Sequence, residues 1–157
     1  MITAADTNVL FDILLQDAKH GAASIAALRR SASAGNVVVG EVVFAELASG
    51  MADVADVDLF LREIGVGLVT SAPEALLLAG KAWRSYTGRG QRGVACADCG
   101  TLNRPRCSKC GVEIHGKQHL LADFLIGGHA AVHADALLTR DRRHFRRYFP
   151  QLRLTHP

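Results

Sequence analysis

Long hydrophobic runs, cysteines outside one short stretch, and internal repeats are all missing from this 157-residue sequence. A membrane-spanning helix needs about 18 or more consecutive apolar residues, and the sequence has no such run. Its first ten residues, MITAADTNVL, have neither the basic start nor the apolar run of a secretory signal peptide. These absences predict a protein without a membrane segment that works in the cytoplasm, where thiols stay reduced. With 49% hydrophobic residues, the chain can bury the core of one domain.

Charge is spread unevenly along the chain, although the formal net charge is only +3. Residues 1–80 hold four Lys and Arg against ten Asp and Glu, whereas residues 81–157 hold fourteen against five. A basic half is typical of proteins that bind a polyanion, and nucleic acid is the leading candidate. A solvated basic surface explains the same asymmetry equally well.

Short apolar runs alternate with stretches of helical apolar spacing, which predicts an α/β fold with a mainly parallel sheet. Ser71 followed by Pro73 is typical of a helix start. The periodic pattern breaks at residues 88–118, which we interpret as an insertion into a single domain spanning 1–157. We expect strands at 1–6, 36–40, 66–71, 136–140 and 152–154, and helices at 7–15, 41–50, 53–64, 73–86, 119–133 and 141–149.

All four cysteines lie inside this insertion, in two Cys-x-x-Cys pairs that are each followed by glycine. Such pairs offer four thiolates to a tetrahedral Zn²⁺ ion, and four thiolates leave no open position for chemistry. We therefore predict a structural zinc site in a zinc-ribbon-like insertion. Disulfides or free thiols are the alternatives, and His115 or His119 is an alternative ligand. The predicted zinc ligands are Cys96, Cys99, Cys107 and Cys110.

Four acidic residues stand where a parallel sheet would bring them together. Asp6 and Asp141 each end a predicted strand, and the carboxyl ends of parallel strands open on one crevice. Glu46 and Asp123 lie on otherwise apolar helical stretches, where a carboxylate is costly to bury unless it is paired. Hard oxygen donors of this kind favour Mg²⁺ or Mn²⁺. Taken singly, each acid is explained as well by a helix start or a solvent-facing helix position.

Several stretches carry a resemblance to a known family: DTNVLFDIL, VVFAEL, LADFLIGGHA and LLTRDRRHFRRYFPQLRL. In combination they resemble the PIN-domain ribonucleases, and in particular the VapC toxins of bacterial toxin–antitoxin pairs. The resemblance covers the chain to about residue 85 and again from residue 119. Residues 88–118 depart from it, because the usual member has a short basic loop there.

The resemblance implies a PIN-like fold and a metal-dependent endoribonuclease with one or two Mg²⁺ or Mn²⁺ ions. It implies an RNA substrate, a cognate antitoxin that blocks the crevice, and a homodimer. It assigns Asp6, Glu46, Asp123 and Asp141 to the acidic cluster, with Thr139 and Asn8 as supporting polar residues. A PIN nuclease of ribosomal RNA processing and a non-catalytic RNA-binding module remain as alternatives.

Basic and aromatic residues near these motifs complete the predictions. Arg146 and Arg147 share the last predicted helix with other arginines that could bind phosphates. His129 and His133 have metal-ligand spacing, but we interpret them as ordinary core or surface histidines, and Trp83 and Tyr86 as core aromatics. The predicted RNA contacts are Arg140, Arg142, Arg143, Arg104 and Arg106.

Overall fold

A five-stranded parallel sheet forms the centre of the computed structural model, which describes residues 1–87, 94, 95, 99, 101–114 and 121–157. Its strand order is β3-β2-β1-β6-β7. The register sets Thr3 opposite both Val37 and Ala136. The predicted α/β class with a mainly parallel sheet is thereby confirmed. The strands are β1 (Ile2–Ala5), β2 (Asn36–Val39), β3 (Val66–Leu68), β6 (Ala136–Leu138) and β7 (Leu154–Thr155).

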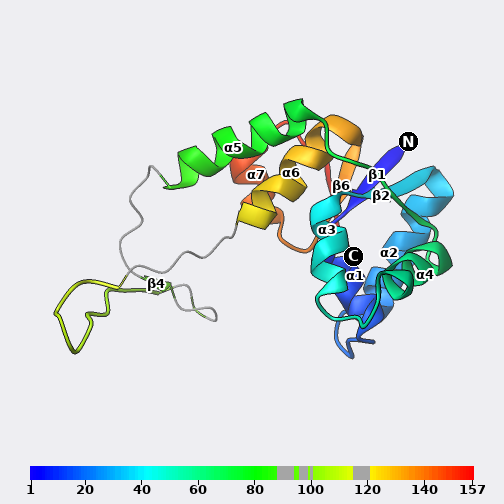
Figure 1. The fold of residues 1–157 in the computed structure, drawn as a ribbon. Helices are drawn as coiled ribbons and strands as arrows, with labels where there is room; N and C mark the ends of the chain where they lie inside the picture. Colours follow the sequence, from blue (N-terminus) through cyan, green and yellow to red (C-terminus); the bar gives the residue numbers. More distant parts are fainter. Residues whose placement is uncertain (88–93, 96–98, 100, 115–120) are drawn as a thin grey trace.

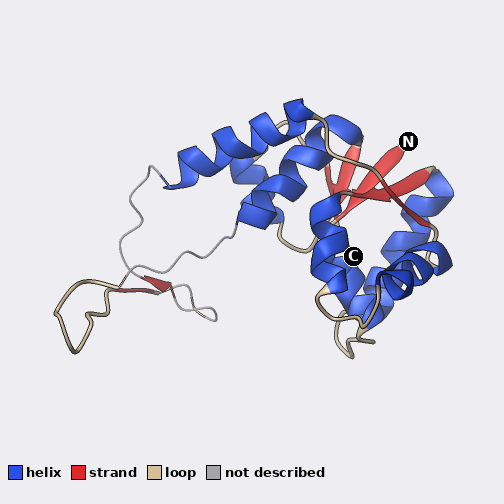
Figure 2. Cartoon of the chain, in the orientation of Figure 1, coloured by secondary structure: helices blue, strands red, loops and turns tan. Residues whose placement is uncertain are grey.

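Helices cover both faces of this sheet. In Figure 1, α5, α6 and α7 gather on one side of the strands, while α2 and α4 lie on the other. Figure 2 shows the strands as a twisted layer between these groups. In the described part of the chain, no helix has the length and apolar character needed to cross a membrane. The helices are α1 (Thr7–Leu14), α2 (Gly21–Ala34), α3 (Glu41–Ala48), α4 (Val54–Glu63), α5 (Pro73–Thr87), α6 (Leu121–His133) and α7 (Arg142–Tyr148).

The strand order reverses its direction between β1 and β6, the place where open α/β sheets form a ligand crevice. Connections from β1 lead outward through β2 to β3, whereas the connection from β6 leads outward in the opposite direction to β7. Such a reversal leaves a gap beyond the carboxyl ends of the two central strands, where ligands bind in open α/β sheets. Residues that directly follow β1 and β6 therefore enter one shared space.

Apolar burial holds the two layers on the sheet. Val39, Leu137 and Phe124 are almost fully buried, because strands covered on both faces must be apolar along their whole length. Trp83 and Tyr86 on α5 pack their rings against Phe124, with centroid separations of 5.3 Å and 5.5 Å. The prediction that these two aromatics belong to the core is confirmed.

One helix, α2, was not predicted from the sequence. Its sequence GAASIAALRRSASA is rich in alanine and serine, so its apolar stripe is weak. Small residues nevertheless suit this position, because Ser24, Ala27 and Ser31 are buried and let α2 approach the sheet and α1. Tertiary packing determines this helix more than periodicity does.

The insertion forms a separate small sheet. Strand β4 (Val94–Ala95) pairs antiparallel with β5 (Leu102–Asn103), and an isolated bridge joins Arg106 to Glu113. Between Tyr86 and Phe124, no described residue belongs to the buried hydrophobic core. The buried core of the five-stranded sheet therefore contains none of the described residues of the insertion.

Candidate active site

Two residues that follow neighbouring strands meet at the crevice. Asp6 comes directly after β1, and its backbone N–H donates to the Leu138 carbonyl at 3.0 Å. Thr139 follows β6 and is fully buried, and its hydroxyl donates to Asp6 Oδ2 at 2.6 Å. The parallel pairing of β1 and β6 thus brings both ends of the chain to one site.

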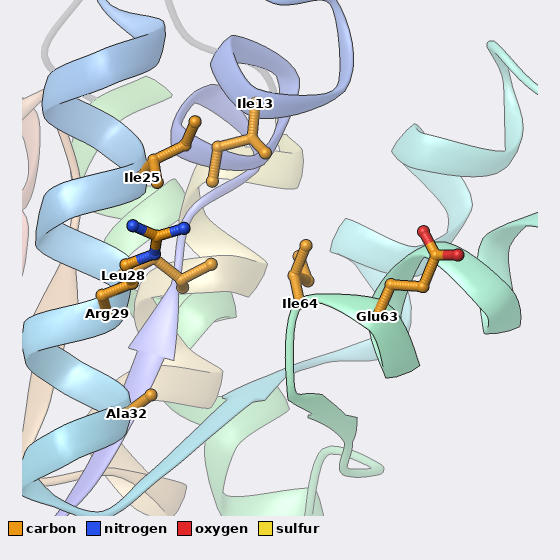
Figure 3. A pocket seen from close by; sticks show the side chains of 7 residues that line it. All are labelled: Ile13, Ile25, Leu28, Arg29, Ala32, Glu63 and Ile64. Atoms are coloured by element: carbon orange, nitrogen blue, oxygen red, sulfur yellow. The ribbon is translucent and has the colours of Figure 1, made fainter.

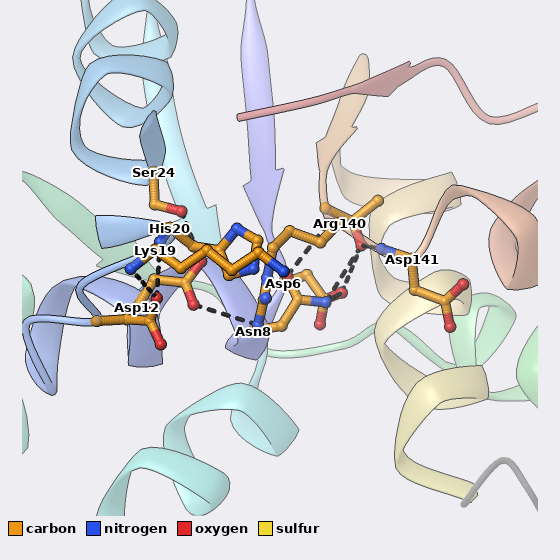
Figure 4. Close-up of polar contacts among 10 residues, drawn as sticks. Asp6, Asn8, Asp12, Lys19, His20, Ser24, Arg140 and Asp141 are labelled. Atoms are coloured by element: carbon orange, nitrogen blue, oxygen red, sulfur yellow. Dashed lines mark hydrogen bonds and ion pairs between the residues drawn. The ribbon is translucent and has the colours of Figure 1, made fainter. Parts of the chain in front are cut away.

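Asp6 is a buried carboxylate with a specific set of partners. Only 6% of its surface is exposed, and Asn8 Nδ2 donates to its Oδ2 at 2.5 Å (Figure 4). Asp6 precedes the first turn of α1, yet its side chain makes no capping hydrogen bond there among the described residues. The carboxylate is turned toward Thr139 and Asn8, so the helix-start interpretation does not account for it.

The pKa of Asp6 is raised to about 6, and burial of the carboxyl is the largest cause of this shift. The hydrogen bond from Thr139 opposes this shift, while the negative charges of Asp123 and Glu46 add to it. Like charges raise a carboxyl pKa only when they lie close to it. Asp123 and Glu46 therefore lie close enough to Asp6 for their charges to act on it.

Glu46 and Asp123 reach the crevice from two different helices. Glu46 lies on α3, is half-buried, and accepts a short hydrogen bond from the Thr7 hydroxyl of α1. Asp123 lies in the first turn of α6 and is also half-buried. Thr7 was not predicted, although its place in the DTN motif directly after Asp6 was a usable signal.

Asp141 has a structural role of its own. Its Oδ1 accepts the His144 N–H at 3.0 Å, so the side chain caps α7. Its backbone N–H donates to the Thr139 hydroxyl at 2.9 Å. Asp141 is thereby tied to Asp6 through Thr139, and in Figure 4 its carboxylate points away from Asp6.

The donors at this site suit a hard divalent cation in their chemistry. Within the described residues, no three His, Cys, Asp or Glu side chains converge closely enough to hold a metal ion. The raised pKa of Asp6 reflects its burial first, with the negative charges of Asp123 and Glu46 adding to it. Carboxylate oxygens that repel one another are what Mg²⁺ or Mn²⁺ would neutralise, so Asp6, Glu46 and Asp123 fit such an ion.

An ion pair beside the site was not predicted from the sequence. Asp12 on α1 is 3% exposed, and its Oδ1 lies 3.2 Å from Arg140 Nη2. Ser24 of α2 donates to the other carboxylate oxygen at 2.6 Å. An acid in the apolar stretch VLFDILL was a signal of the same kind as Glu46 and Asp123. Arg140, a predicted RNA contact, is engaged with Asp12.

The other predicted RNA contacts lie on the surface. Arg142 and Arg143 begin α7, directly after Asp141, and are exposed. On the insertion, Arg104 is exposed, and Arg106 donates to the Gly111 carbonyl at 3.1 Å. These four positions are accessible to a polyanion, and two of them directly follow Asp141 in the sequence.

The two histidines of α6 bind the loop before α5. Ser71 Oγ lies 3.1 Å from His129 Nδ1, and the Ala72 N–H donates to His133 Nε2 at 2.9 Å. Burial, followed by the nearby charge of His133, lowers the pKa of His129. His129 is 3% exposed, which fits the predicted ordinary core or surface role.

Three of the predicted zinc ligands lie within the described residues, namely Cys99, Cys107 and Cys110. Cys96, like His115 and His119, lies outside them. Cys107 and Cys110 are free thiols. The Gly111 N–H donates to the Cys107 carbonyl at 2.8 Å, and Gly111 has a φ of +72°, which glycine adopts readily. Hydrogen bonds from the backbone N–H groups of Cys110 and Lys109 lower the pKa of Cys107.

The fold and the site together define a class of protein: a parallel α/β domain with an acidic cluster at its topological switch point. The chain belongs to the PIN domain family, whose pattern it matches over residues 4–149. No curated protein sequence matches it.

Solved structures with the same fold include three protein assemblies of low sequence identity. VapBC2 from Rickettsia felis bound to a promoter DNA fragment has 17% identity and a TM-score of 0.62, with 99% of this chain and 98% of that chain covered. VapBC-1 from nontypeable Haemophilus influenzae has 18% identity and a TM-score of 0.61, with the same coverage. FitAB bound to the IR36 DNA fragment has 16% identity and a TM-score of 0.55, with 100% and 95% covered.

Proposed function

We propose that this protein is a metal-dependent endoribonuclease, the toxin of a VapBC-type toxin–antitoxin pair. Membership of the PIN family, a family of nucleases, supports nuclease chemistry. The observation that carries the proposal is the buried Asp6 carboxylate, whose Oδ2 accepts hydrogen bonds from both Thr139 and Asn8. Burial, together with the charges of Asp123 and Glu46, also raises its pKa, as is typical of functional sites.

Each acidic residue has its own part in this proposal. Asp6 and Asp123 would be the central ligands of Mg²⁺ or Mn²⁺, and Glu46 and Asp141 would complete the site directly or through water. Thr139 and Asn8 hold the Asp6 carboxylate in one orientation, because both donate to its Oδ2. Thr7 does the same for Glu46.

The reaction is the hydrolysis of an RNA phosphodiester bond. When bound, the cation lowers the pKa of a water molecule and neutralises charge on the scissile phosphate. Water forms a new P–O bond, the P–O3′ bond breaks, and the proton count balances in a 5′-phosphate and a 3′-hydroxyl. The exposed Arg142 and Arg143 would hold flanking phosphates, with Arg104 and Arg106 extending this contact along the insertion.

This proposal implies a small antitoxin protein as the partner. It also implies that the toxin works in the cytoplasm and forms a homodimer. The structurally similar VapBC and FitAB proteins are toxin–antitoxin complexes, which supports such a partner. Size determination in solution, with and without the protein of the adjacent reading frame, tests both assemblies.

One apolar pocket gives the antitoxin a place to bind. The pocket has a volume of about 320 Å³ and lies between α1, α2 and α4 (Figure 3). Ile13 in its wall belongs to α1, the helix that also carries Asn8 of the acidic site. One basic and one acidic residue accompany the apolar wall, which suits an amphipathic segment of the partner. The lining residues are Ile13, Ile25, Leu28, Arg29, Ala32, Glu63 and Ile64.

Substitution of Ile25, which is 38% exposed, tests this location. Ile25→Glu should abolish inhibition by the antitoxin and leave RNA cleavage unchanged, because the acidic site lies outside the pocket. Leu76→Glu on α5 is the matched control, since Leu76 is similarly exposed and lines no part of this pocket. Equal inhibition of both variants would exclude the pocket as the binding place.

The insertion is proposed to bind one structural Zn²⁺ ion through Cys96, Cys99, Cys107 and Cys110. The turn from Cys107 to Gly111 supports this, because its backbone N–H groups point at the Cys107 sulfur and lower its pKa. A thiolate is the form that binds zinc. Zinc binding would order a segment whose own apolar residues are few.

The central experiment is cleavage of a defined RNA pool by the antitoxin-free protein in Mg²⁺ and in Mn²⁺. We expect metal-dependent cuts with 5′-phosphate ends, and their loss in Asp6→Asn. Asp58→Asn is the matched control, because Asp58 is an exposed acid of α4, far along the chain from the crevice.

The outcomes separate the competing functions. Cuts that persist in Asp6→Asn but vanish in a mock purification would place the activity at another site. The absence of any cleavage by the wild type, despite RNA binding, would favour a non-catalytic RNA-binding module. Cuts confined to ribosomal precursor RNA, without an antitoxin gene nearby, would favour RNA processing.

A further inference from the structure

The carboxylate of Asp12 is the most deeply buried acid in the described part of the chain that the nuclease mechanism does not use. It is 3% exposed and lies on α1, which also carries Asn8. Ser24 Oγ donates to its Oδ2 at 2.6 Å, and Arg140 Nη2 approaches its Oδ1 at 3.2 Å (Figure 4). A buried carboxylate persists only with such partners, so Asp12 holds Arg140 in a fixed position.

Arg140 is fastened to α1 at two points. Its guanidinium pairs with Asp12, and its backbone N–H donates to Asn8 Oδ1 at 3.2 Å. Because Asp12 and Asn8 are four positions apart on one helix, they lie on the same face. The loop that leaves β6 is therefore attached to α1 by both the side chain and the backbone of a single residue.

The same attachment reaches the acidic site through Asn8. While Asn8 Oδ1 accepts from Arg140, Asn8 Nδ2 donates to Asp6 Oδ2 at 2.5 Å. The arginine contact thereby decides which way the Asn8 amide faces and presents its donor to Asp6. Thr139, the neighbour of Arg140, donates to the same oxygen of Asp6 at 2.6 Å.

We propose that Asp12 and Arg140 are positioning residues whose ion pair holds Asn8 and Thr139 against the Asp6 carboxylate. The inference rests on the proposed nuclease function and adds two residues to it. It also assigns Arg140 a role different from that of Arg142 and Arg143, since its guanidinium pairs with Asp12 within the protein.

The test compares Asp12→Asn, Arg140→Gln and the double variant on one RNA oligonucleotide with a mapped cut. Each single variant should lower kcat by about 10- to 100-fold, the usual cost of losing a residue that orients a metal ligand. KM should change by less than about 3-fold, because phosphate contacts are retained. The kcat of the double variant should be no lower than that of the more impaired single variant, because both substitutions break the same ion pair.

Arg142→Gln serves as the reference for a direct phosphate contact. We expect it to raise KM and to flatten the salt dependence of KM, with kcat little changed. If Arg140→Gln behaves like Arg142→Gln while Asp12→Asn leaves kcat unchanged, Arg140 is an RNA contact and the proposal is wrong.

Mn²⁺ binding and the unfolding temperature distinguish the positioning role from a merely structural effect and from a failure of the nuclease assignment. Binding of Mn²⁺ to the RNA-free protein should weaken about 10-fold in both single variants, and Arg140→Lys should recover part of the affinity and of kcat. The unfolding temperature distinguishes a loss of fold from a loss of positioning. Both side chains are neutral in the double variant, so it should unfold at a temperature at least as high as either single variant. Wild-type protein that binds Mn²⁺ but cuts no RNA refutes the nuclease assignment, whereas unchanged Mn²⁺ affinity in both variants refutes the positioning role.

Discussion

The Thr139 hydroxyl donates to the Asp6 carboxylate at 2.6 Å across 133 positions of sequence, and it also accepts the Asp141 N–H at 2.9 Å. One buried oxygen atom thus links the two acids that follow strands β1 and β6. The parallel pairing of the two strands brings Thr139 to Asp6, whereas contacts within its own loop with Thr139 and His144 hold Asp141.

Replacement of Thr139 by valine should impair the site without creating a cavity in the core. Thr139→Val leaves the Asp141 N–H without its partner and takes a donor from Asp6. We expect RNA cleavage to fall about 10- to 100-fold and the free energy of unfolding to fall by about 1–3 kcal/mol. The loss of a hydrogen bond to the ionised form should also raise the pKa of Asp6 further, which moves the activity midpoint to higher pH.

Thr139→Ser is the matched control for this variant. It keeps the hydroxyl and removes only a methyl group, so cleavage and the pH midpoint should stay near those of the wild type. Equal impairment of the serine and valine variants would assign the effect to packing. Cleavage rates over a pH series and denaturant unfolding provide both readouts.

The raised pKa of Asp6 predicts how stability changes with pH in the metal-free protein. The folded state holds this proton up to about pH 6, whereas the unfolded chain releases it near 3.8. Stability therefore falls as pH rises from about 4 to 6, and the loss above pH 6 is on the order of 3 kcal/mol. Asp6→Asn should remove this loss and unfold later than the wild type at about pH 7.5.

The difference between the two proteins should vanish near pH 4, where the wild-type carboxyl is protonated in the folded state. Saturating Mg²⁺ should stabilise the wild type against unfolding but should not stabilise Asp6→Asn. The affinity of the wild type for Mg²⁺ should increase as pH rises through about 6. Thermal unfolding at several pH values, with and without Mg²⁺, measures these effects. An Asp6→Asn variant less stable than the wild type above pH 7 would contradict the assigned pKa shift.

Zinc should be needed by the insertion and not by the main sheet. The described core residues come from outside 87–120, so we expect loss of the ion to leave their packing in place. We expect the purified protein to hold one Zn²⁺ per chain, and Cys107→Ser to lose it with little change in the main unfolding transition. Protease sensitivity between residues 87 and 121 should increase in the variant. A large fall in its unfolding temperature would show instead that the insertion supports the core.

Acids on apolar helical stretches violate the ordinary pattern of burial, and this pattern pointed to Glu46 and Asp123, while Asp6 was singled out by its place at a strand end. Thr139 was assigned through the family resemblance, and the structure joins it directly to Asp6. Asp12 violates the same pattern and was overlooked, because its partner Arg140 lies near the other end of the chain and looked like an RNA contact. A single sequence does not specify such a pairing, which the contact between α1 and the loop after β6 creates.

Helix α2 was missed for a different physical reason. Its alanines and serines carry little hydrophobic periodicity, and they are selected by the narrow space beside the sheet and α1. The predicted elements with large apolar residues, such as β2 and α6, appear where the sequence placed them, with ends that differ by one or two residues.

Close helix packing predicts opposite effects of the same substitution at two glycines. A Cβ at Gly128 on α6 would clash with the Ala75 carbonyl oxygen of α5, a backbone atom that cannot turn aside. Gly128→Ala should therefore lower the free energy of unfolding by about 1–3 kcal/mol and disturb α6, which carries Asp123. A Cβ at Gly80 on α5 meets no atom within 4 Å among the described residues, so Gly80→Ala should stabilise the protein by about 0.5–1 kcal/mol. Denaturant unfolding of both variants measures the difference, and a Gly128→Ala protein as stable as Gly80→Ala would contradict the close contact of α5 with α6.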